Sequence, residues 1–110
     1  MKLWEIIDVM KCGNPNQIVA IDVDGTDENW IYGRVYDRET KACISDKINA
    51  YDKRLMDCEI GSIFAAIVND DDMVEFARKK GVKVEKFKDC EISIGFSEDD
   101  VYNWEVLGLV

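Results

Sequence analysis

The centre of this chain reads Ile18-Val19-Ala20-Ile21-Asp22-Val23-Asp24-Gly25-Thr26. The run opens with β-branched and apolar residues that favour a strand, and its Asp-Gly pair favours a turn. The following segment, 30–36, alternates with the period of a strand. We therefore predict an antiparallel hairpin of 18–23 and 30–36 at the centre of a small sheet.

The second strand of this hairpin would carry aromatic side chains on one face. Ile31 and Val35 would share the opposite face. The aromatic face would consist of Trp30, Tyr32, Arg34 and Tyr36. Large apolar patches rarely remain exposed, so we expect a helix to cover it.

Two helices are indicated by apolar residues at helical spacing. The first spans about 2–12 and is followed by Gly13 and Pro15, which prevent its continuation. The second spans about 70–80. Its first turn is acidic, its last turn is basic, and Gly81 follows it, as expected for a capped helix.

Further strands are indicated at 42–45, 60–68, 82–85, 92–96 and 104–107. The most apolar of them, 60–68, suits a buried central strand as well as it suits a helix, and we interpret it as a strand. The segment 46–59 is equally compatible with a loop and a brief helix. We predict one α+β domain over 1–110, with a largely antiparallel sheet of five to six strands and two helices.

The composition limits the class of protein. The chain has 110 residues and is 47% hydrophobic, enough for one core without metal or disulfides. No apolar run is long enough to span a bilayer, and the first residues lack the pattern of a secretion signal. We expect a cytoplasmic protein that does not bind membranes.

The four cysteines, Cys12, Cys43, Cys58 and Cys90, are scattered, and the chain has no histidine. This pattern provides neither a zinc site nor a Ser-His or Cys-His pair for acyl transfer. We interpret the cysteines as reduced and mostly buried. We expect no cofactor and no bound metal.

The formal net charge is −9. Such a charge disfavours nucleic acid, because phosphate backbones need lysine and arginine to displace their counterions. A protein with a basic surface is the natural complement. Alternatively, the charge serves only to keep the domain soluble.

The run Asp22-Val23-Asp24-Gly25-Thr26 resembles the first motif of the haloacid dehalogenase superfamily. The resemblance implies Asp22 as the phosphorylated nucleophile, Asp24 as the acid/base and Mg²⁺ between them. The run Asn69-Asp70-Asp71-Asp72-Met73 is similar to that family's late metal-binding motif. The segment 27–36 lacks the crossover helix that such a parallel sheet requires, so we interpret the match as coincidental and keep a phosphatase as an alternative.

The two ends of the chain, Met1-Lys2-Leu3-Trp4-Glu5-Ile6-Ile7 and Asn103-Trp104-Glu105-Val106, resemble those of small phage and prophage accessory proteins. Some of those proteins inhibit bacterial defence systems. The resemblance covers about the first eleven and last eight residues, whereas the middle of the chain differs. It implies a binding protein instead of a catalyst.

We therefore hypothesise a non-enzymatic acidic protein that inhibits or modulates a protein partner by binding the partner's basic surface. A nucleic-acid-binding surface is one such basic surface. A homodimer is compatible with the sequence. The expected contact residues are Asp27, Glu28, Trp30, Tyr32, Asp70, Asp71, Asp72, Glu98, Asp99 and Asp100.

A competing hypothesis is a module that sequesters a nucleotide-like small molecule. Trp30, Tyr32 and Tyr36 would stack on the base. Since the chain is acidic, a phosphorylated ligand would also require Arg34 and Arg38 close by.

Overall fold

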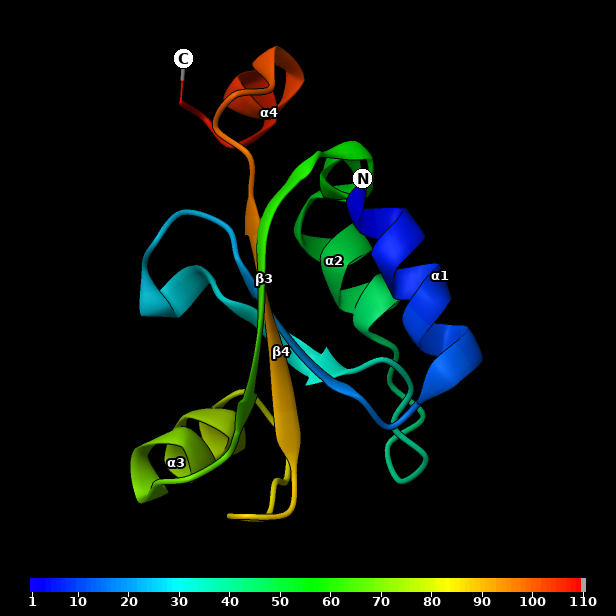
Figure 1. Cartoon of the computed structure of the whole chain (residues 1–110), viewed down its shortest axis with the longest axis vertical. Coiled ribbons are helices and arrows are strands. Elements are labelled where there is room, and N and C mark those ends of the chain that lie inside the picture. The colour runs from blue at the N-terminus through cyan, green and yellow to red at the C-terminus, as the bar shows by residue number, and fades with distance from the viewer. Residues whose placement is uncertain (110) are drawn as a thin grey trace.

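A computed structural model describes residues 1–109, apart from the side chain of Asp27. Short 3₁₀ turns occupy Asp27–Asn29 and Lys53–Asp57. The main elements (Figure 1) are α1 (Leu3–Gly13), β1 (Ile18–Asp22), β2 (Ile31–Arg34), α2 (Ile44–Asp52), β3 (Ile60–Ile67), α3 (Asp71–Lys79), β4 (Cys90–Phe96) and α4 (Val101–Val106).

The four strands form one mixed sheet in the order β2-β1-β4-β3. β1 pairs antiparallel with β2 and parallel with β4, and β3 pairs antiparallel with β4. The predicted hairpin is confirmed in its β1–β2 pairing, and the α+β class is confirmed. The sheet itself has fewer strands than the five to six predicted, and its central pair is parallel.

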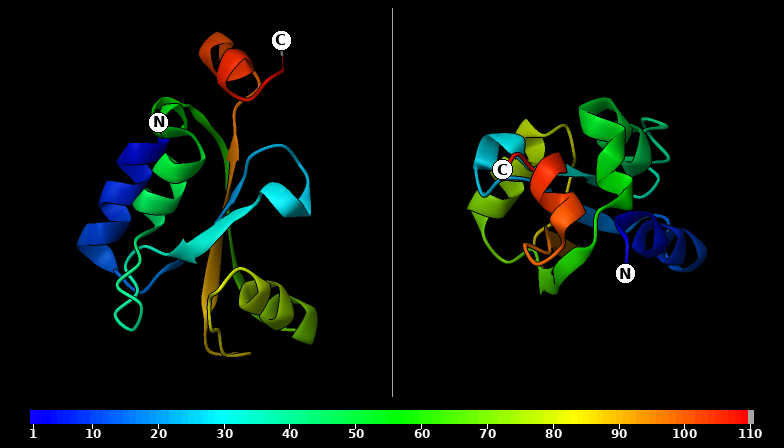
Figure 2. Two further views of the ribbon diagram at one scale, coloured as in Figure 1. Left: turned by 180° about the vertical axis from the view of Figure 1, so that it is seen from behind. Right: turned by 90° about the horizontal axis from the view of Figure 1, so that it is seen from above.

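Helices cover both faces of the sheet (Figure 2). α1 and α2 lie over the face that contains the buried residues Val19, Ile21 and Ile94. α3 lies over the opposite face, where the Tyr32 ring meets the Phe76 ring edge-on at 5.6 Å between centroids. The expectation that a helix covers the aromatic face is thus confirmed for Tyr32.

The predicted helices near 2–12 and 70–80 are α1 and α3. At α3, the Asp70 carboxylate caps the helix by accepting a hydrogen bond from the Met73 N–H at 2.8 Å. Gly81 follows the helix with φ of +81°, a conformation that glycine adopts without steric cost. α4 was not predicted, and α2 lies mostly within 46–59, for which a brief helix was one of the two alternatives.

The strand predicted at 42–45 is wrong. Cys43 makes one isolated bridge to Tyr36, and α2 begins at Ile44. Ile44 and Ile48 are both buried and lie four residues apart, which is the spacing of one helix face. The segment 46–59, left undetermined above, contains the rest of α2 and the 3₁₀ turn.

The strands predicted at 82–85 and 104–107 are also wrong. Val82 and Val84 are both buried in the core on the α3 side of the sheet. Their segment, however, pairs with no strand of the described chain. Residues 104–106 belong to α4, which Asp100 caps by accepting a hydrogen bond from the Tyr102 N–H at 2.9 Å.

β3 is a strand as predicted, but it is neither central nor buried. β4 takes the position between β1 and β3, so that β3 becomes an edge. The exposed fractions of its large side chains are 46% for Ile63, 68% for Phe64 and 57% for Ile67. The prediction failed because strand order depends on pairing between distant segments.

The four cysteines are free. Only Cys58 is buried, while Cys12 and Cys90 are exposed and Cys43 is half-buried. The prediction that most of them are buried is therefore wrong. Cys12 lies in the last turn of α1 and Cys90 begins β4, so neither faces the core.

Candidate protein-interaction surface

The two predicted acidic clusters lie at opposite ends of the sheet. Residues 70–72 follow the end of β3, and residues 98–100 follow the end of β4. Because these strands are antiparallel, their ends point in opposite directions. Figure 1 accordingly shows α3 at one end of the molecule and α4 at the other. The clusters therefore do not form one contiguous acidic surface.

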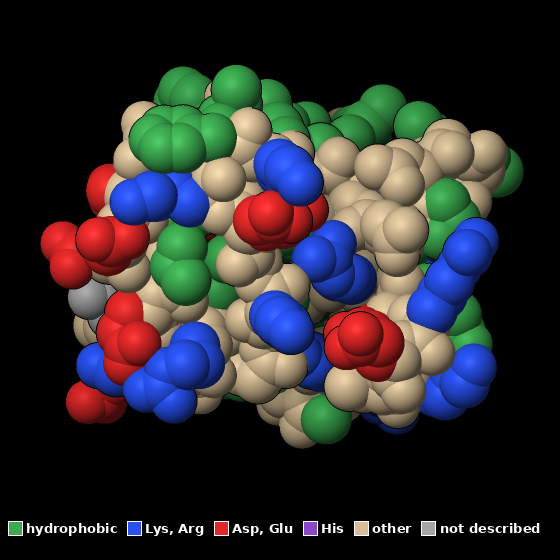
Figure 3. Space-filling view, turned by 90° about the horizontal axis from the view of Figure 1, so that it is seen from below, with side chains coloured by type: hydrophobic (Ala, Val, Ile, Leu, Met, Phe, Trp, Pro, Cys, Tyr) green, Lys and Arg blue, Asp and Glu red, His purple; other side chains and the backbone are tan. Residues whose placement is uncertain are grey.

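The cluster at 70–72 is largely offset by nearby cations. Asp70 is occupied as the helix cap, and Asp71 pairs with Lys86 at 2.9 Å. Six of the 14 lysines and arginines fall within 78–88. Figure 3 views this end and shows basic and acidic side chains interspersed. This end is thus of mixed charge.

The opposite end, which we call the α4 end and define as residues 97–109, is acidic without internal compensation. No lysine or arginine follows Lys88, whereas Glu98, Asp99, Asp100 and Glu105 fall within the α4 end. Of the cations from elsewhere, Arg54 is held by Asp52, with Nη2 and Oδ2 at 2.8 Å. Lys2 shares a hollow with Asp100, so the negative charge of residues 98–100 is compensated only in part.

Apolar and aromatic side chains project from α4 among these carboxylates. The exposed fractions are 71% for Val101, 41% for Tyr102 and 40% for Trp104. A helix of six residues is too short to be stable alone, so these side chains depend on tertiary contacts for their position.

Asn103 provides that support. It is fully buried, accepts a hydrogen bond from the Glu59 N–H at 3.0 Å, and donates to the carbonyls of Glu59 at 2.9 Å and Ser97 at 2.8 Å. The Trp104 indole N–H also donates to the Glu98 carbonyl. These bonds fix the helix against the start of β3 and direct Tyr102 and Trp104 outward.

A hollow of about 360 Å³ lies beside the helix, lined by Lys2, Asp57, Glu59, Asp100 and Tyr102. Desolvation, followed by neighbouring negative charges such as that of Asp57, raises the pKa of Tyr102 above its ordinary value. Its hydroxyl donates a hydrogen bond to the Arg54 carbonyl at 3.5 Å. Three carboxylates and one lysine line the hollow, so it suits a cationic group of a partner.

The acidic loop after β1 has a structural role instead. Asp22 accepts a hydrogen bond from the Gly25 N–H at 2.7 Å. Asp24 accepts from the Thr26 hydroxyl at 2.7 Å and from the Asn29 amide at 2.6 Å. These bonds, that of the Thr26 hydroxyl first, lower the pKa of Asp24. The carboxylates thus hold the turn together.

The haloacid dehalogenase arrangement is not formed. Asp22 lies opposite Gly95, whereas Asp70 follows Ile67, which lies opposite Cys90 at the other end of β4. Among the residues that the structure describes, no three acidic or cysteine side chains are grouped to hold a metal ion. Glu28 is exposed, and the side chain of Asp27 lies outside the described part of the structure.

The predicted aromatic stacking face is not formed. Tyr32 is 2% exposed and donates its hydroxyl hydrogen bond to Glu91 at 3.0 Å, so its assignment as a contact residue is wrong. Burial, followed by the charge of Glu91, raises its pKa. Trp30 is half-buried against the same core, and Tyr36 lies beyond β2.

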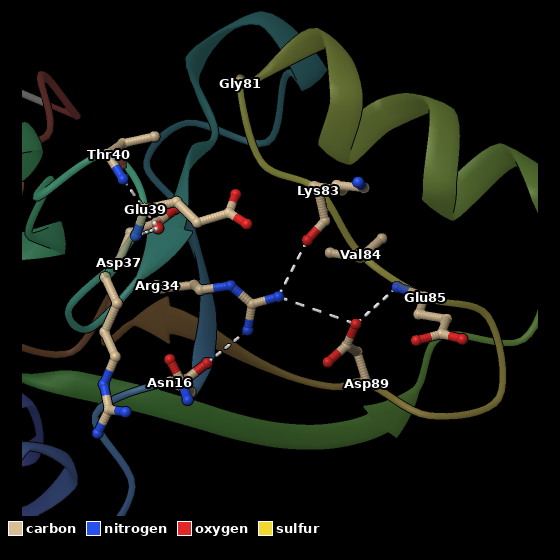
Figure 4. Close-up of a pocket in the computed structure, with 11 residues that line it drawn as sticks. Asn16, Arg34, Asp37, Glu39, Thr40, Gly81, Lys83, Val84, Glu85 and Asp89 are labelled. Carbon is tan, nitrogen blue, oxygen red and sulfur yellow. Dashed lines mark hydrogen bonds and ion pairs between the residues drawn. The ribbon is translucent and has the colours of Figure 1, made fainter.

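Arg34 and Arg38 do line a common cavity of about 570 Å³ (Figure 4). Arg34 is occupied there, because it donates to the carbonyls of Asn16 at 2.7 Å and Lys83 at 3.0 Å and lies 3.8 Å from Asp89. Four carboxylates also line the cavity, and none of the three aromatic residues does. The cavity is unfavourable for a phosphorylated, base-stacked ligand.

No family model, curated protein or solved structure matches this chain. Within residues 1–109, no helix has both the length and the apolar character needed to cross a bilayer.

The sequence interpretation missed Tyr102 and Trp104 as an exposed aromatic pair, because it assigned 104–107 to a strand. A signal was present. The acidic residues 98–100 precede α4 in the same way that 70–72 precede α3, and Asp100 is an ordinary N-cap residue.

Proposed function

We propose that this chain is a non-enzymatic protein-binding module that docks its α4 end onto a basic surface of a partner protein. The observation that carries the proposal is the group of exposed residues Val101, Tyr102 and Trp104 among carboxylates that no following lysine or arginine offsets. Aromatic side chains dominate the binding energy at many interfaces, and complementary charge accelerates association and selects the partner.

Such docking would inhibit a partner whose basic surface otherwise holds nucleic acid. This mode of action agrees with that of phage accessory inhibitors, which the chain ends resemble. The partner's surface should present lysine or arginine around an apolar hollow, into which Trp104 or Tyr102 inserts.

The proposal is tested by immobilising this chain and measuring the binding of basic partner proteins to it at low and at high salt. The variant Glu98→Gln/Asp99→Asn/Glu105→Gln removes three charges at the α4 end and leaves the Asp100 cap intact. The matched control Asp8→Asn/Glu39→Gln/Asp72→Asn removes three exposed charges elsewhere. Their net charges are identical.

A partner retained at low salt and by the control, but lost with the α4-end variant, supports the proposal. Equal loss in both variants would show that net charge alone acts, and equal retention would exclude the α4 end. Trp104→Ala should then weaken binding to the same partner about 30-fold, the effect of removing a central aromatic anchor.

A further inference from the structure

The outer edge of β3 is open. β3 pairs with β4 alone among the described strands, and every residue from 61 to 67 is exposed. In Figure 1 this strand runs in front of β4. The side that faces the viewer in Figure 1 forms the upper margin of Figure 3, and this margin is lined with hydrophobic side chains.

The hydrogen bonds at both ends of β3 identify which backbone groups point outward. The Val68 N–H donates to the Asp89 carbonyl at 2.9 Å, and the Val68 carbonyl accepts from the Phe87 N–H at 2.7 Å. Both backbone groups of Val68 therefore point toward the β4 side. Successive residues of a strand alternate in direction. The N–H and C=O groups of Ile63, Ala65 and Ile67 therefore point away from the sheet.

Residues 1–3 cover the outer edge only where the strand begins. The Ile60 N–H donates to the Met1 carbonyl at 2.9 Å, and the Leu3 N–H donates to the Cys58 carbonyl at 3.1 Å. At the other end, the buried Val68 leaves the edge. The open part thus extends from 61 to 67 and is centred near Ala65.

This edge lacks the usual protection against pairing. Edge strands commonly carry lysine, proline or another charged residue, and the run from Ile60 to Val68 carries none of these in a chain of net charge −9. Its irregularity lies between Ile60 and Ser62, outside the open centre. An uncharged strand offers nothing specific to a basic partner, and it is where two acidic copies approach with least repulsion.

We propose that β3 binds β3 of a second copy of this chain, antiparallel and about a two-fold axis through Ala65, to form a continuous eight-stranded sheet. In this register Ile63 lies opposite Ile67 of the other copy and Ala65 opposite Ala65. All three outward-facing residues of each copy then form their hydrogen bonds. Phe64 lies opposite the small Ala66, so that large and small side chains alternate.

The dimer goes beyond the proposed function and does not depend on it. α4 is attached at the start of β3, and an antiparallel dimer places the two starts at opposite ends of the joint interface. Both α4 ends remain exposed. The pair would be a bivalent binder, in which the second contact benefits from high effective concentration.

The test is sedimentation equilibrium of the whole chain and of Ala65→Pro. Proline removes an outward N–H and leaves the bonds to β4 in place, as in natural edge strands. The wild type should dimerise, and Ala65→Pro should raise the dissociation constant by about 30-fold or more, because two symmetry-related hydrogen bonds are lost. The matched variant Ala65→Ser should remain dimeric, and circular dichroism should show the same fold for all three.

The register is tested by oxidative cross-linking in a Cys12→Ser/Cys90→Ser background. Ala65→Cys should form a disulfide-linked dimer, because directly opposite residues of a hydrogen-bonded pair lie about 5.5 Å apart. Ala66→Cys, which faces Phe64, should cross-link far less. A wild type that is monomeric at about 100 μM, an Ala65→Pro dimer of unchanged affinity, or equal cross-linking at both positions would overturn the proposal. A monomer that pairs this edge with a strand of a different protein would overturn it as well.

Discussion

β1 and β3 have equally apolar sequences and opposite environments. Residues Ile18–Ile21 of β1 are at most 1% exposed, whereas Ile63, Phe64 and Ile67 of β3 are about half exposed or more. β1 has a strand on each side and helices over both faces, while β3 has one neighbouring strand. An apolar strand is thus expected to be covered by other protein groups, and these can belong to the same chain, as for β1, or to another molecule.

The largest effect expected from this comparison comes from truncating isoleucine in each strand. Ile21→Ala, at a fully buried site, should lower the free energy of unfolding by about 3–4 kcal/mol, through lost burial and a cavity. Ile63→Ala, at a site 46% exposed, should lower it by less than about 1 kcal/mol. Urea unfolding in the Ala65→Pro background measures both without association. Similar losses would refute the comparison.

The start of β3 differs from its open centre, since Asn103 anchors α4 there. Asn103→Ala should cost about 2–3 kcal/mol, because the Glu59 N–H and the carbonyls of Glu59 and Ser97 lose their buried partner. Asn49→Ala, at an exposed position of α2, is the matched control and should stay within about 0.5 kcal/mol. Hydrogen exchange should show α4 opening in the first variant, and full protection of α4 there would disprove the anchoring role.

The sequence predicted those parts of the fold that depend on local signals. The caps and charged turns of α3 and the Asp-Gly turn after β1 lie within a few residues of the elements that they define. The pairing of β1 with β4 joins segments about 70 residues apart, and no local pattern specifies it. This non-local pairing moved β3 to the edge and left 82–85 without a strand partner.

The candidate site was predictable in the same limited way. Charge alone identified 98–100, but only the structure separates this cluster from 70–72 and places the cations of 78–88 beside the latter. Tyr32 fits its predicted strand, yet it faces α3 and not solvent. A period-2 pattern distinguishes two faces and does not indicate which one a helix covers.

Alkaline pH should lower the stability of the fold by a smaller amount, through the Cys58 thiol just before the start of β3. Burial, followed by nearby carboxylates such as Asp100, raises the pKa of the Cys58 thiol from 9.0 to about 11. The folded state therefore retains a proton that the unfolded chain releases, so this contribution to stability is complete below pH 9.0 and is lost as pH rises to about 11. Unfolding midpoints from pH 8 to 11 should fall more steeply for the wild type than for Cys58→Ala. Parallel curves would exclude the effect.

The smallest effect is expected at Phe64, where it bears most directly on the comparison. Phe64 is 68% exposed and lies opposite Ser93, so Phe64→Lys removes little buried surface and should change the free energy of unfolding of the monomer by at most about 0.5 kcal/mol. The same substitution adds a charge to an uncharged edge and should abolish self-association. Phe76→Lys, on α3 against Tyr32, is the contrasting variant and should destabilise the fold strongly. If Phe64→Lys cost the monomer as much as Phe76→Lys, something in this chain would have to cover β3 in solution, and its apolar side chains would need no second copy to explain them.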